Sequence, residues 1–241
     1  MMCRILIIIP CYNEQYAIVD AISQLQQAIA KLPQYECEIL VVNDGSKDKS
    51  LQKIQETGVK YLDLSVNLGI GGAMQTGYQY AKINNFDIAI QLDGDGQHNP
   101  QFISNLVTPI VNKKANVVIG SRFIDKQGFQ STSLRRKGIN YFSWLNKALI
   151  GVKILDATSG FRALDKKAIK VVCEYYPETY PEPESIILYA FKNLKIEEVA
   201  VKMYSREGGK SSITGIKTFF YMFKVTLGSL FLYFRLKSNK K

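Results

Sequence analysis

Hydrophobic and polar residues alternate along the first half of the chain in blocks that predict strands and helices in turn. Short continuous apolar runs, rich in β-branched residues, predict strands that are buried on both faces. Apolar residues at helical spacing between these runs, such as Ile18, Ile22, Leu25 and Ile29, predict helices. The predicted strands cover residues 4–9, 38–42, 59–64, 87–92 and 116–120, and the predicted helices cover residues 18–29, 50–55, 73–83 and 102–111.

This alternation predicts an α/β fold with a Rossmann-like, mostly parallel central sheet and helices on both faces. Ligands bind such sheets beyond the carboxyl ends of the strands. Polar loops follow four of the predicted strands, so we expect their side chains to converge on one edge of the sheet. The residues expected there are Asn13, Glu14, Asp44, Asn67, Asp93 and Asp95.

The regular alternation ends after residue 120. A polar segment at residues 125–133 predicts a loop, and a helix is predicted over residues 134–150. Further helices are predicted from Lys166 and Pro181, and residues 196–204 form a strand-like run. Pro181, Glu182 and Glu184 suit the first turn of a helix, where proline is tolerated and acidic groups are favourable.

The last part of the chain predicts an amphipathic helix. Its apolar residues recur at helical spacing from Ile216 to Phe234, and basic residues gather at its end. We therefore divide the chain into a main α/β domain of residues 1–212 and a basic amphipathic helix of residues 213–241. One interpretation is a helix lying in the interface of an anionic membrane, and the other is packing on the domain or on a second subunit. No apolar stretch reaches the length of about 18 residues that a spanning helix needs.

Composition narrows the class of protein further. With 241 residues and 46% hydrophobic residues, the chain has enough material for one large core. Its net charge of +10 favours an anionic membrane surface or an anionic substrate. Nucleic acid is not an expected partner, because no recognition module is present. Four isolated cysteines and a short apolar N-terminus without signal-peptide features predict reduced thiols in a cytoplasmic protein.

The stretch Asp93-Gly94-Asp95 carries the most specific chemistry. Side chains repeat every second residue in extended chain, so both carboxylates lie on one side of it. Hard carboxylate oxygens suit a divalent cation that keeps substrate phosphate in its coordination shell. Asp and Gly also form ordinary turns without metal, and this stretch alone does not decide between the two. The glycines at residues 69–72 lack the G-x-G-x-x-G pattern, so a dinucleotide site is not expected.

With these residues in view, the chain resembles the family 2 glycosyltransferases of the GT-A fold, and most of all the dolichyl- or polyprenyl-phosphate sugar synthases. The resemblance spans about residues 4–212, and six motifs in the same order make it specific. They are Ile9-Pro10-Cys11-Tyr12-Asn13-Glu14, Val42-Asn43-Asp44-Gly45-Ser46, Asp93-Gly94-Asp95 with Gln97, Gly120-Ser121-Arg122-Phe123, Ser159-Gly160-Phe161-Arg162, and Arg206-x-x-Gly209-x-Ser211.

The resemblance implies a role for each of these segments. A nucleoside-diphosphate sugar would lie against Pro10, Tyr12, Glu14, Asp44, Asn67, Gly69 and Asp93, and Asp95 and Gln97 would hold Mg²⁺ or Mn²⁺ against the diphosphate. The acceptor phosphate would meet Arg122, Ser159, Arg162, Arg206, Lys210 and Ser211. The residues expected to carry catalysis are Asp93, Asp95, Arg122 and Arg206.

The implied reaction is an inverting, metal-dependent transfer of a sugar to a polyprenyl phosphate at the inner face of the cell membrane. A phosphate nucleophile is already anionic at neutral pH, so no general base is needed. The alternative is extension of a glycan or lipid-linked saccharide, where a hydroxyl acceptor requires a base from Asp156, Glu182 or Glu184. Many relatives have spanning helices at this end of the chain, so a membrane partner protein could supply the anchor here. A homodimer is also an open alternative. A scaffold without activity is disfavoured by the intact Asp93 and Asp95.

Overall fold

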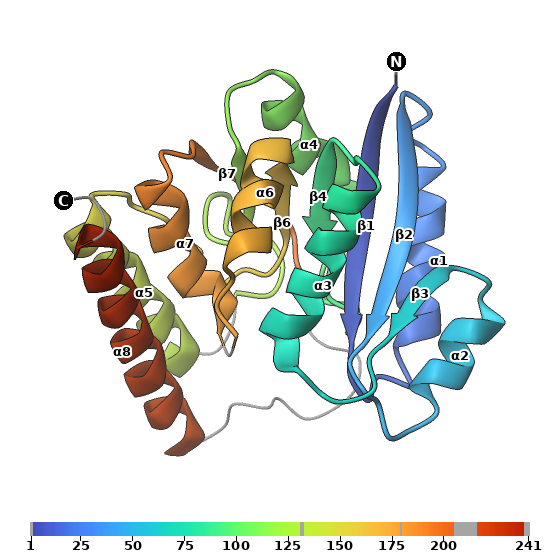
Figure 1. The fold of residues 1–241 in the computed structure, drawn as a ribbon, viewed down its shortest axis with the longest axis horizontal. Coiled ribbons are helices and arrows are strands. Elements are labelled where there is room, and N and C mark those ends of the chain that lie inside the picture. Colours follow the sequence, from blue (N-terminus) through green and yellow to red (C-terminus); the bar gives the residue numbers. More distant parts are fainter. Residues whose placement is uncertain (1, 131–132, 179, 205–215, 239–241) are drawn as a thin grey trace.

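A seven-stranded sheet with the order β3-β2-β1-β4-β6-β5-β7 forms the centre of the molecule (Figure 1). The structure is a computed structural model that describes residues 2–130, 133–178, 180–204 and 216–238. The strands are β1 (Cys3–Cys11), β2 (Tyr35–Asn43), β3 (Lys60–Asp63), β4 (Ile88–Gln91), β5 (Val117–Ser121), β6 (Arg162–Asp165) and β7 (Ile196–Ala200).

The sheet is mostly parallel, as the sequence predicts. Strand β1 pairs in parallel with β2 and β4, β2 with β3, and β5 with β7. Strand β6 runs antiparallel to both β4 and β5, and the sequence pattern did not reveal it. It has only four residues and begins with Arg162, so it shows neither an apolar run nor a clear alternation.

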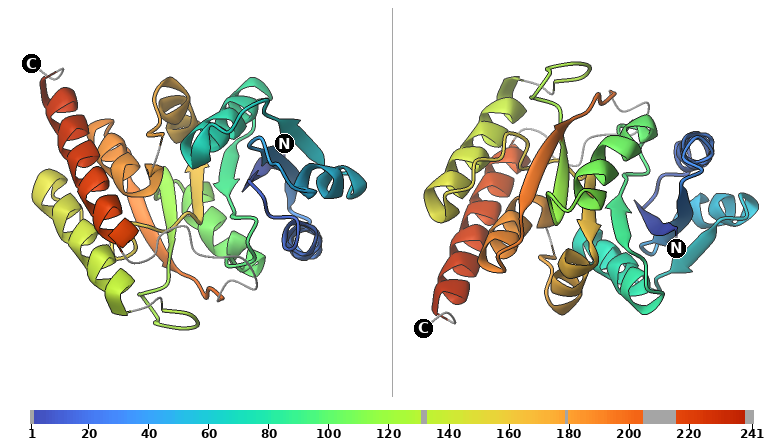
Figure 2. Two further views of the ribbon diagram at one scale, coloured as in Figure 1. Left: turned by 90° about the horizontal axis from the view of Figure 1, so that it is seen from below. Right: turned by 90° about the horizontal axis from the view of Figure 1, so that it is seen from above.

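Helices cover both faces of the sheet, as predicted (Figure 2). Helices α3, α6 and α7 contribute to the core on one face, and α1, α2 and α4 to the core on the other. The helices are α1 (Ile18–Ile29), α2 (Ser50–Glu56), α3 (Gly69–Ile83), the short 3₁₀ helix η1 (Pro100–Phe102), α4 (Ile103–Val111), α5 (Ser133–Ile150), α6 (Lys166–Glu174), α7 (Pro181–Phe191) and α8 (Ile216–Ser238).

The continuous apolar run of β1 supplies both cores at once. Leu6 and Ile8 point into the core beneath α3, while Ile5, Ile7 and Ile9 point into the core beneath α1 and α4. All five are fully buried, and each contributes about 1.5–3 kcal/mol of transfer free energy. A strand buried on both faces therefore explains why this segment has no polar alternation.

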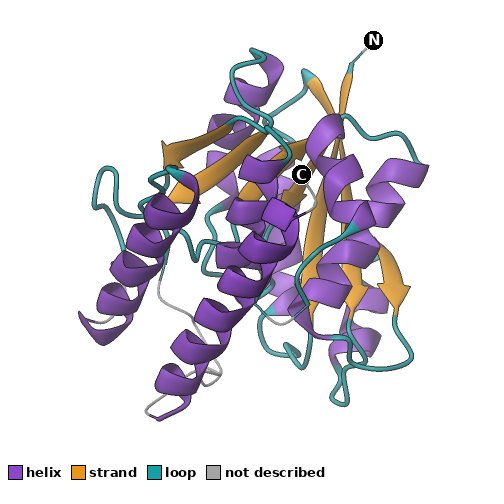
Figure 3. Ribbon diagram, turned by 60° about the vertical axis from the view of Figure 1, so that its left-hand side comes forward, coloured by secondary structure: helices purple, strands orange, loops and turns teal. Residues whose placement is uncertain are grey.

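Helices α5 and α8 lie side by side at the edge of the molecule beyond α7 (Figure 3). Leu232 of α8 packs in a cluster with Ile187 and Leu188 of α7, and the hydroxyls of Tyr141 and Thr226 are 3.1 Å apart between α5 and α8. The expected boundary at residue 212 lies outside the described residues. Within the described residues, no helix is both long and apolar enough to span a bilayer.

Candidate active site

The loops after β1, β2 and β3 meet at the carboxyl edge of the sheet and bind one another. The amide of Asp44 donates to the carbonyl of Cys11 at 2.8 Å, and the amide of Glu14 donates to Ser50 Oγ at 2.8 Å. The side-chain amide of Asn67 donates to the carbonyl of Asp44 at 3.1 Å. Segments that lie far apart in the sequence thus form one connected rim, which is where the sequence placed the ligand site.

Asp44 lies inside this rim and is only 3% exposed. Its Oδ1 accepts the amide hydrogen of Leu68 at 2.7 Å, just before α3 begins. Burial raises the pKa of Asp44, and hydrogen bonds from the amides of Leu68 and Gly69 oppose that rise. The carboxylate therefore fixes the start of α3. Tyr12 projects nearby with 44% of its surface exposed, on the loop that begins beyond Pro10 in β1.

Asp93 follows β4 and its position is set by groups on three sides. Its amide donates to His98 Nδ1 at 3.0 Å, and Gln91 Nε2 donates to its Oδ1 at 3.2 Å. His98 stacks on Phe161 with ring centroids 5.0 Å apart, and its Nε2 lies 3.6 Å from Asp93 Oδ2. The carboxylate of Asp93 also lies close to the backbone of Gly160. Glycine allows this close contact, because a Cβ there would be 3.2 Å from both carboxylate oxygens.

The sequence pattern did not reveal Gln91, His98 and Gly160 as partners of Asp93. His98 is the only histidine of the chain, and it directly follows the Asp93-Gly94-Asp95 stretch and Gln97. The position of His98 next to this stretch was the sequence signal that could have indicated its contact with Asp93. Nothing in the local sequence pattern could have brought Gly160 next to Asp93, because the two lie on different loops.

Asp95 is 4% exposed, and its Oδ1 accepts the amide hydrogen of Gln97 at 3.0 Å. Gly96 lies between them with φ of 75°, and a Cβ there would meet nothing within 4 Å. The carbonyl of Gln97 accepts from the amide of Tyr204, which ties this loop to the segment after β7. Carboxylate and amide oxygens beside an open glycine fit a hard cation. In the described part of the chain, no group of three His, Cys, Asp or Glu side chains could hold a metal.

Arg122 follows β5 and forms a bidentate pair with Asp156. Its Nε and Nη2 each lie 2.7 Å from a carboxylate oxygen of Asp156, which is fully buried. Burial lowers the pKa of Arg122, but the hydrogen bonds and negative charge of Asp156 outweigh burial and raise it overall. Arg122 and Arg136 both lie 5.5 Å from the ring of Phe123. Two guanidinium groups thus gather beside one aromatic ring.

Arg162 differs from its expected placement. Its side chain has 0% exposure, and its nitrogens donate to the carbonyls of Ser159 and Ala157 and to Ser185 Oγ at 2.7–2.9 Å. Ser159 is 2% exposed, and its Oγ accepts the amide hydrogen of Phe161. Both side chains therefore organise the segment before β6. The remaining expected phosphate ligands, Arg206, Lys210 and Ser211, lie outside the described residues.

The three candidate bases have separate environments. Asp156 is bound to Arg122, and a Cβ on Gly228 of α8 would be 2.5 Å from Glu184 Oε1. Burial, with the charge of Glu182, raises the pKa of Glu184 to about 7. Burial also raises the pKa of Glu182; the charge of Arg162 opposes the rise, and that of Asp93 adds to it. The negative charge of Asp93 thus acts directly on Glu182.

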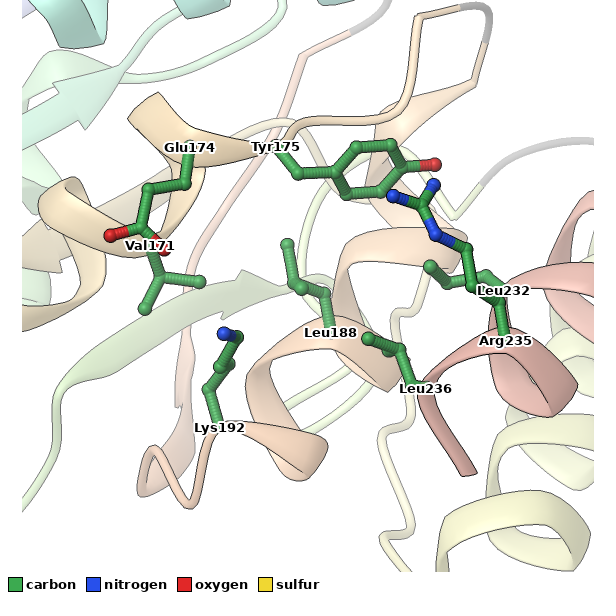
Figure 4. A pocket seen from close by; sticks show the side chains of 8 residues that line it. All are labelled: Val171, Glu174, Tyr175, Leu188, Lys192, Leu232, Arg235 and Leu236. Atoms are coloured by element: carbon green, nitrogen blue, oxygen red, sulfur yellow. The ribbon is translucent and has the colours of Figure 1, made fainter. Parts of the chain in front are cut away.

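A separate apolar pocket lies between α6, α7 and α8 and contains none of the expected site residues (Figure 4). Val171, Leu188, Leu232 and Leu236 form its apolar walls, and Arg235 lies over the ring of Tyr175 at 5.0 Å. It does not belong to the site described above. The four cysteines are free, in agreement with the expected reduced thiols.

Comparison with known proteins identifies the family of the chain. The family model "Glycosyl transferase family 2" matches residues 6–173, and the chain belongs to this family. It is 31% identical to the UDP-N-acetylglucosamine–dolichyl-phosphate N-acetylglucosaminyltransferase of Methanococcus voltae, covering 94% of this chain and 97% of that one. It is 26% identical to the undecaprenyl-phosphate mannosyltransferase of Micrococcus luteus, covering 88% of each.

A solved structure with a similar fold is glucosyl-3-phosphoglycerate synthase from Mycobacterium tuberculosis in complex with Mn²⁺, UDP and phosphoglyceric acid. Its TM-score is 0.69 at 18% identity, and the match covers 96% of this chain and 78% of that one. The chain is therefore a glycosyltransferase with the GT-A fold, as the motifs implied.

Proposed function

We propose that this glycosyltransferase moves a sugar from a nucleoside-diphosphate sugar to a polyprenyl phosphate, with inversion at the anomeric carbon. The observation that carries the proposal is the similarity, over nearly the whole of both chains, to a dolichyl-phosphate N-acetylglucosaminyltransferase. The cluster of Arg122 and Arg136 around Phe123 supports it, because guanidinium groups bind phosphate oxygens in a bidentate way.

The donor would bind along the rim formed by the loops after β1, β2 and β4. Tyr12 offers an exposed ring for the base beside Pro10 and Glu14, while Asp44 and Asn67 shape the floor and Gly69 begins α3. Asp93 would receive hydroxyl groups of the ribose and sugar. Gln91 binds its carboxylate, His98 accepts from its backbone amide, and Gly160 leaves room for the carboxylate.

Asp95 and Gln97 would hold Mg²⁺ or Mn²⁺ against the diphosphate. When bound, such a cation supplies Lewis-acid stabilisation of the negative charge on the departing nucleoside diphosphate. The backbone amide of Gln97 donates to Asp95 Oδ1, and this bond orients the carboxylate that would bind the cation. A solved structure of similar fold that contains Mn²⁺ and UDP supports the same kind of site here.

The acceptor phosphate would meet Arg122 and Arg136, with Arg206, Lys210 and Ser211 of the segment outside the described residues as further ligands. We assign Arg162 and Ser159 an indirect part, because both are buried and bound within the protein. They would support the loop that places Gly160 against Asp93. The nucleophilic oxygen of the phosphate would attack the anomeric carbon in a single displacement, since it is already deprotonated near neutral pH.

A hydroxyl acceptor is the second candidate, and Glu182 is the observation that favours it. Among the three candidate bases, Asp156 is held by Arg122, Glu184 lies against α8, and Glu182 is subject to the charge of Asp93. A carboxyl with a raised pKa suits a general base near neutral pH. Under this second function, the variant Glu182→Gln should lose about 100-fold or more in transfer, whereas phosphate transfer needs no base.

Helix α8 would place the enzyme on the cytoplasmic face of an anionic membrane. Apolar side chains repeat along one side of it and are 37–71% exposed, and Trp144 of the neighbouring α5 is 62% exposed. Lys224, Arg235 and Lys237 add positive charge to the same helix. The exposed apolar residues of α8 are Phe220, Phe223, Leu227, Phe231 and Phe234.

Two experiments test these proposals. Purified full-length chain should transfer label from a panel of nucleotide sugars to a polyprenyl phosphate, and mild acid should release the sugar; transfer only to glycan hydroxyls would refute the lipid-phosphate assignment. The double variant Phe223→Glu, Phe231→Glu should stop floating with phosphatidylglycerol vesicles, whereas Ile83→Glu on α3, where the native side chain is 77% exposed, should still float. Unchanged flotation of the double variant would contradict the membrane assignment. So would the finding that the native chain is a dimer and that the two substitutions dissociate it.

A further inference from the structure

Asp156 has no assigned part in the reaction proposed above, yet it contacts Arg122 through three separate bonds. Its Oδ2 accepts from the backbone amide of Arg122 at 3.1 Å and from Nε at 2.7 Å, and its Oδ1 accepts from Nη2 at 2.7 Å. Thr158 Oγ also lies 3.4 Å from Nη2. These bonds fix both the backbone of Arg122 and the orientation of its guanidinium group.

The loop that carries Asp156 is itself held from the neighbouring strand β7. Glu198 Oε2 accepts the amide hydrogen of Leu155 at 2.7 Å, and its Oε1 accepts that of Asp156 at 2.8 Å. Strand β7 pairs in parallel with β5, at whose end Ser121 precedes Arg122. The two carboxylates therefore connect the loop of Asp156 to the strand that presents Arg122.

The geometry of the pair determines which N–H groups of Arg122 stay available to bind a ligand. A guanidinium group has five N–H donors in a rigid plane, and Asp156 occupies the edge formed by Nε and Nη2. The Nη1 amino group lies outside that edge and keeps a fixed direction. Asp156 also offsets the positive charge of Arg122, so Arg122 would act by directed hydrogen bonds more than by long-range attraction.

Stability alone gives a weak reason for such a pair. Removing a carboxylate and a guanidinium from water costs several kcal/mol, and replacement of a buried ion pair by apolar residues is often neutral or stabilising. Asp156 is fully buried, and the side chain of Arg122 is 13% exposed. An arginine that is nearly buried yet reaches the acceptor side gains from a partner that sets its direction.

We infer that Asp156, held by Glu198, is a positioning residue that aims Nη1 of Arg122 at the phosphate of the acceptor. The inference rests on the proposed lipid-phosphate acceptor. It excludes Asp156 from the general-base role that the sequence left open, since both of its oxygens are bound to Arg122.

The test compares Asp156→Asn, Arg122→Ala and the double variant in the full-length chain, with farnesyl phosphate as a soluble acceptor probe. Asp156→Asn should weaken farnesyl phosphate binding and raise the acceptor KM by about 10- to 100-fold. The donor Kd should change much less than the acceptor KM, because none of the hydrogen bonds described for this pair goes to a donor loop and only the charge of Asp93 acts on Arg122 from that side. The double variant should be no worse than Arg122→Ala alone, since Asp156 acts through that side chain.

Two further variants keep the test decisive. Glu198→Gln should shift the same acceptor parameters in the same direction even if Asp156→Asn folds poorly. Asp165→Asn is the matched control: Asp165 caps α6 by accepting from Ala168 and also accepts from Asn116, so its loss should lower stability and leave the acceptor KM unchanged.

The outcomes separate the inference from the function on which it rests. If the native chain does not bind farnesyl phosphate, the lipid-phosphate proposal fails. If the native chain binds it and Arg122→Ala weakens binding, but Asp156→Asn and Glu198→Gln do not, only the positioning role fails. Additive losses in the double variant would also overturn the positioning role, because they would show that Asp156 acts independently of Arg122.

Discussion

Replacing Gly160 by alanine tests whether the position of Asp93 controls activity. The backbone of Gly160 has no positive φ, so alanine fits its conformation without strain. The new Cβ would, however, lie 2.8 Å from Gln91 Nε2 and 3.2 Å from both carboxylate oxygens of Asp93. The substitution therefore acts on the carboxylate of Asp93, which we expect to receive the donor sugar, and on Gln91, which binds that carboxylate.

The size of the effect follows from these distances. Non-bonded heavy atoms prefer separations of about 3.5 Å or more, so the amide of Gln91 would shift by about 0.7 Å and the carboxylate of Asp93 by about 0.3 Å. Misplacement of a reacting group by about 1 Å can cost about 100-fold in rate, so we expect a loss of about 10- to 100-fold in kcat. Overpacking of about 1–3 kcal/mol is partly offset by about 0.4–1 kcal/mol from the smaller entropy of the unfolded chain.

The assay combines transfer kinetics with urea unfolding of the same preparations. Gly138→Ala in α5 is the control, because its Cβ would meet only Met222 Sδ at an ordinary 3.7 Å. That control should keep full activity and gain up to about 1 kcal/mol of stability. Native kcat in Gly160→Ala, or a loss that matches only the fraction of unfolded protein, would refute the link between Gly160 and Asp93.

Three other predictions follow from single residues. Asp95→Asn, or removal of divalent cations with EDTA, should reduce transfer by at least about 100-fold while the far-ultraviolet circular dichroism stays native; full activity in either case would contradict the metal site. Since burial raises the pKa of Glu184 to about 7, the folded state holds its proton longer, so stability should fall as the pH rises from about 4.5 to 7. Glu184→Gln should match the native free energy of unfolding at pH 4 and exceed it by about 1 kcal/mol at pH 8, after allowance for solvent screening; an equal deficit at both pH values would contradict this. Gly45→Ala should lower stability by about 2–4 kcal/mol, because its φ is 65° and its Cβ would lie 2.9 Å from the backbone nitrogen of Asn67. Gly58→Ala, with φ of 71° and no neighbour within 4 Å, should cost only about 1 kcal/mol, and equal losses would rule out the steric contribution.

Much of the fold was predictable because its signals are local. The apolar run of β1 is buried on both faces, and Ile18, Ile22 and Leu25 form the buried side of α1. The alternation of such segments determines a parallel sheet with right-handed crossovers, and with it the edge where the polar loops meet. The sequence therefore predicted which loops form the rim around Asp44 and Asn67, but not the individual contacts within it.

Local signals do not report the long-range partners of a polar side chain. Arg162 has the same flanking motif whether it faces a ligand or the interior, and its burial depends on Ser185, which lies 23 residues away. The short antiparallel β6 was missed for the same reason, since its strand character comes from pairing with β4 and β5. The role of Asp156 depends on Arg122 and Glu198, each more than 30 residues distant.

By itself, then, the amino-acid sequence determined the alternation of strands and helices up to residue 120, the family and the sheet edge where the polar loops meet. Each of these follows from periodicity or from short contiguous motifs. Only the tertiary structure decided which polar and charged groups bind one another, as in the pairs that hold Asp93 and Arg122. The physical reason is that a charge is satisfied by whatever the fold brings within about 3 Å of it, and sequence spacing does not encode that distance.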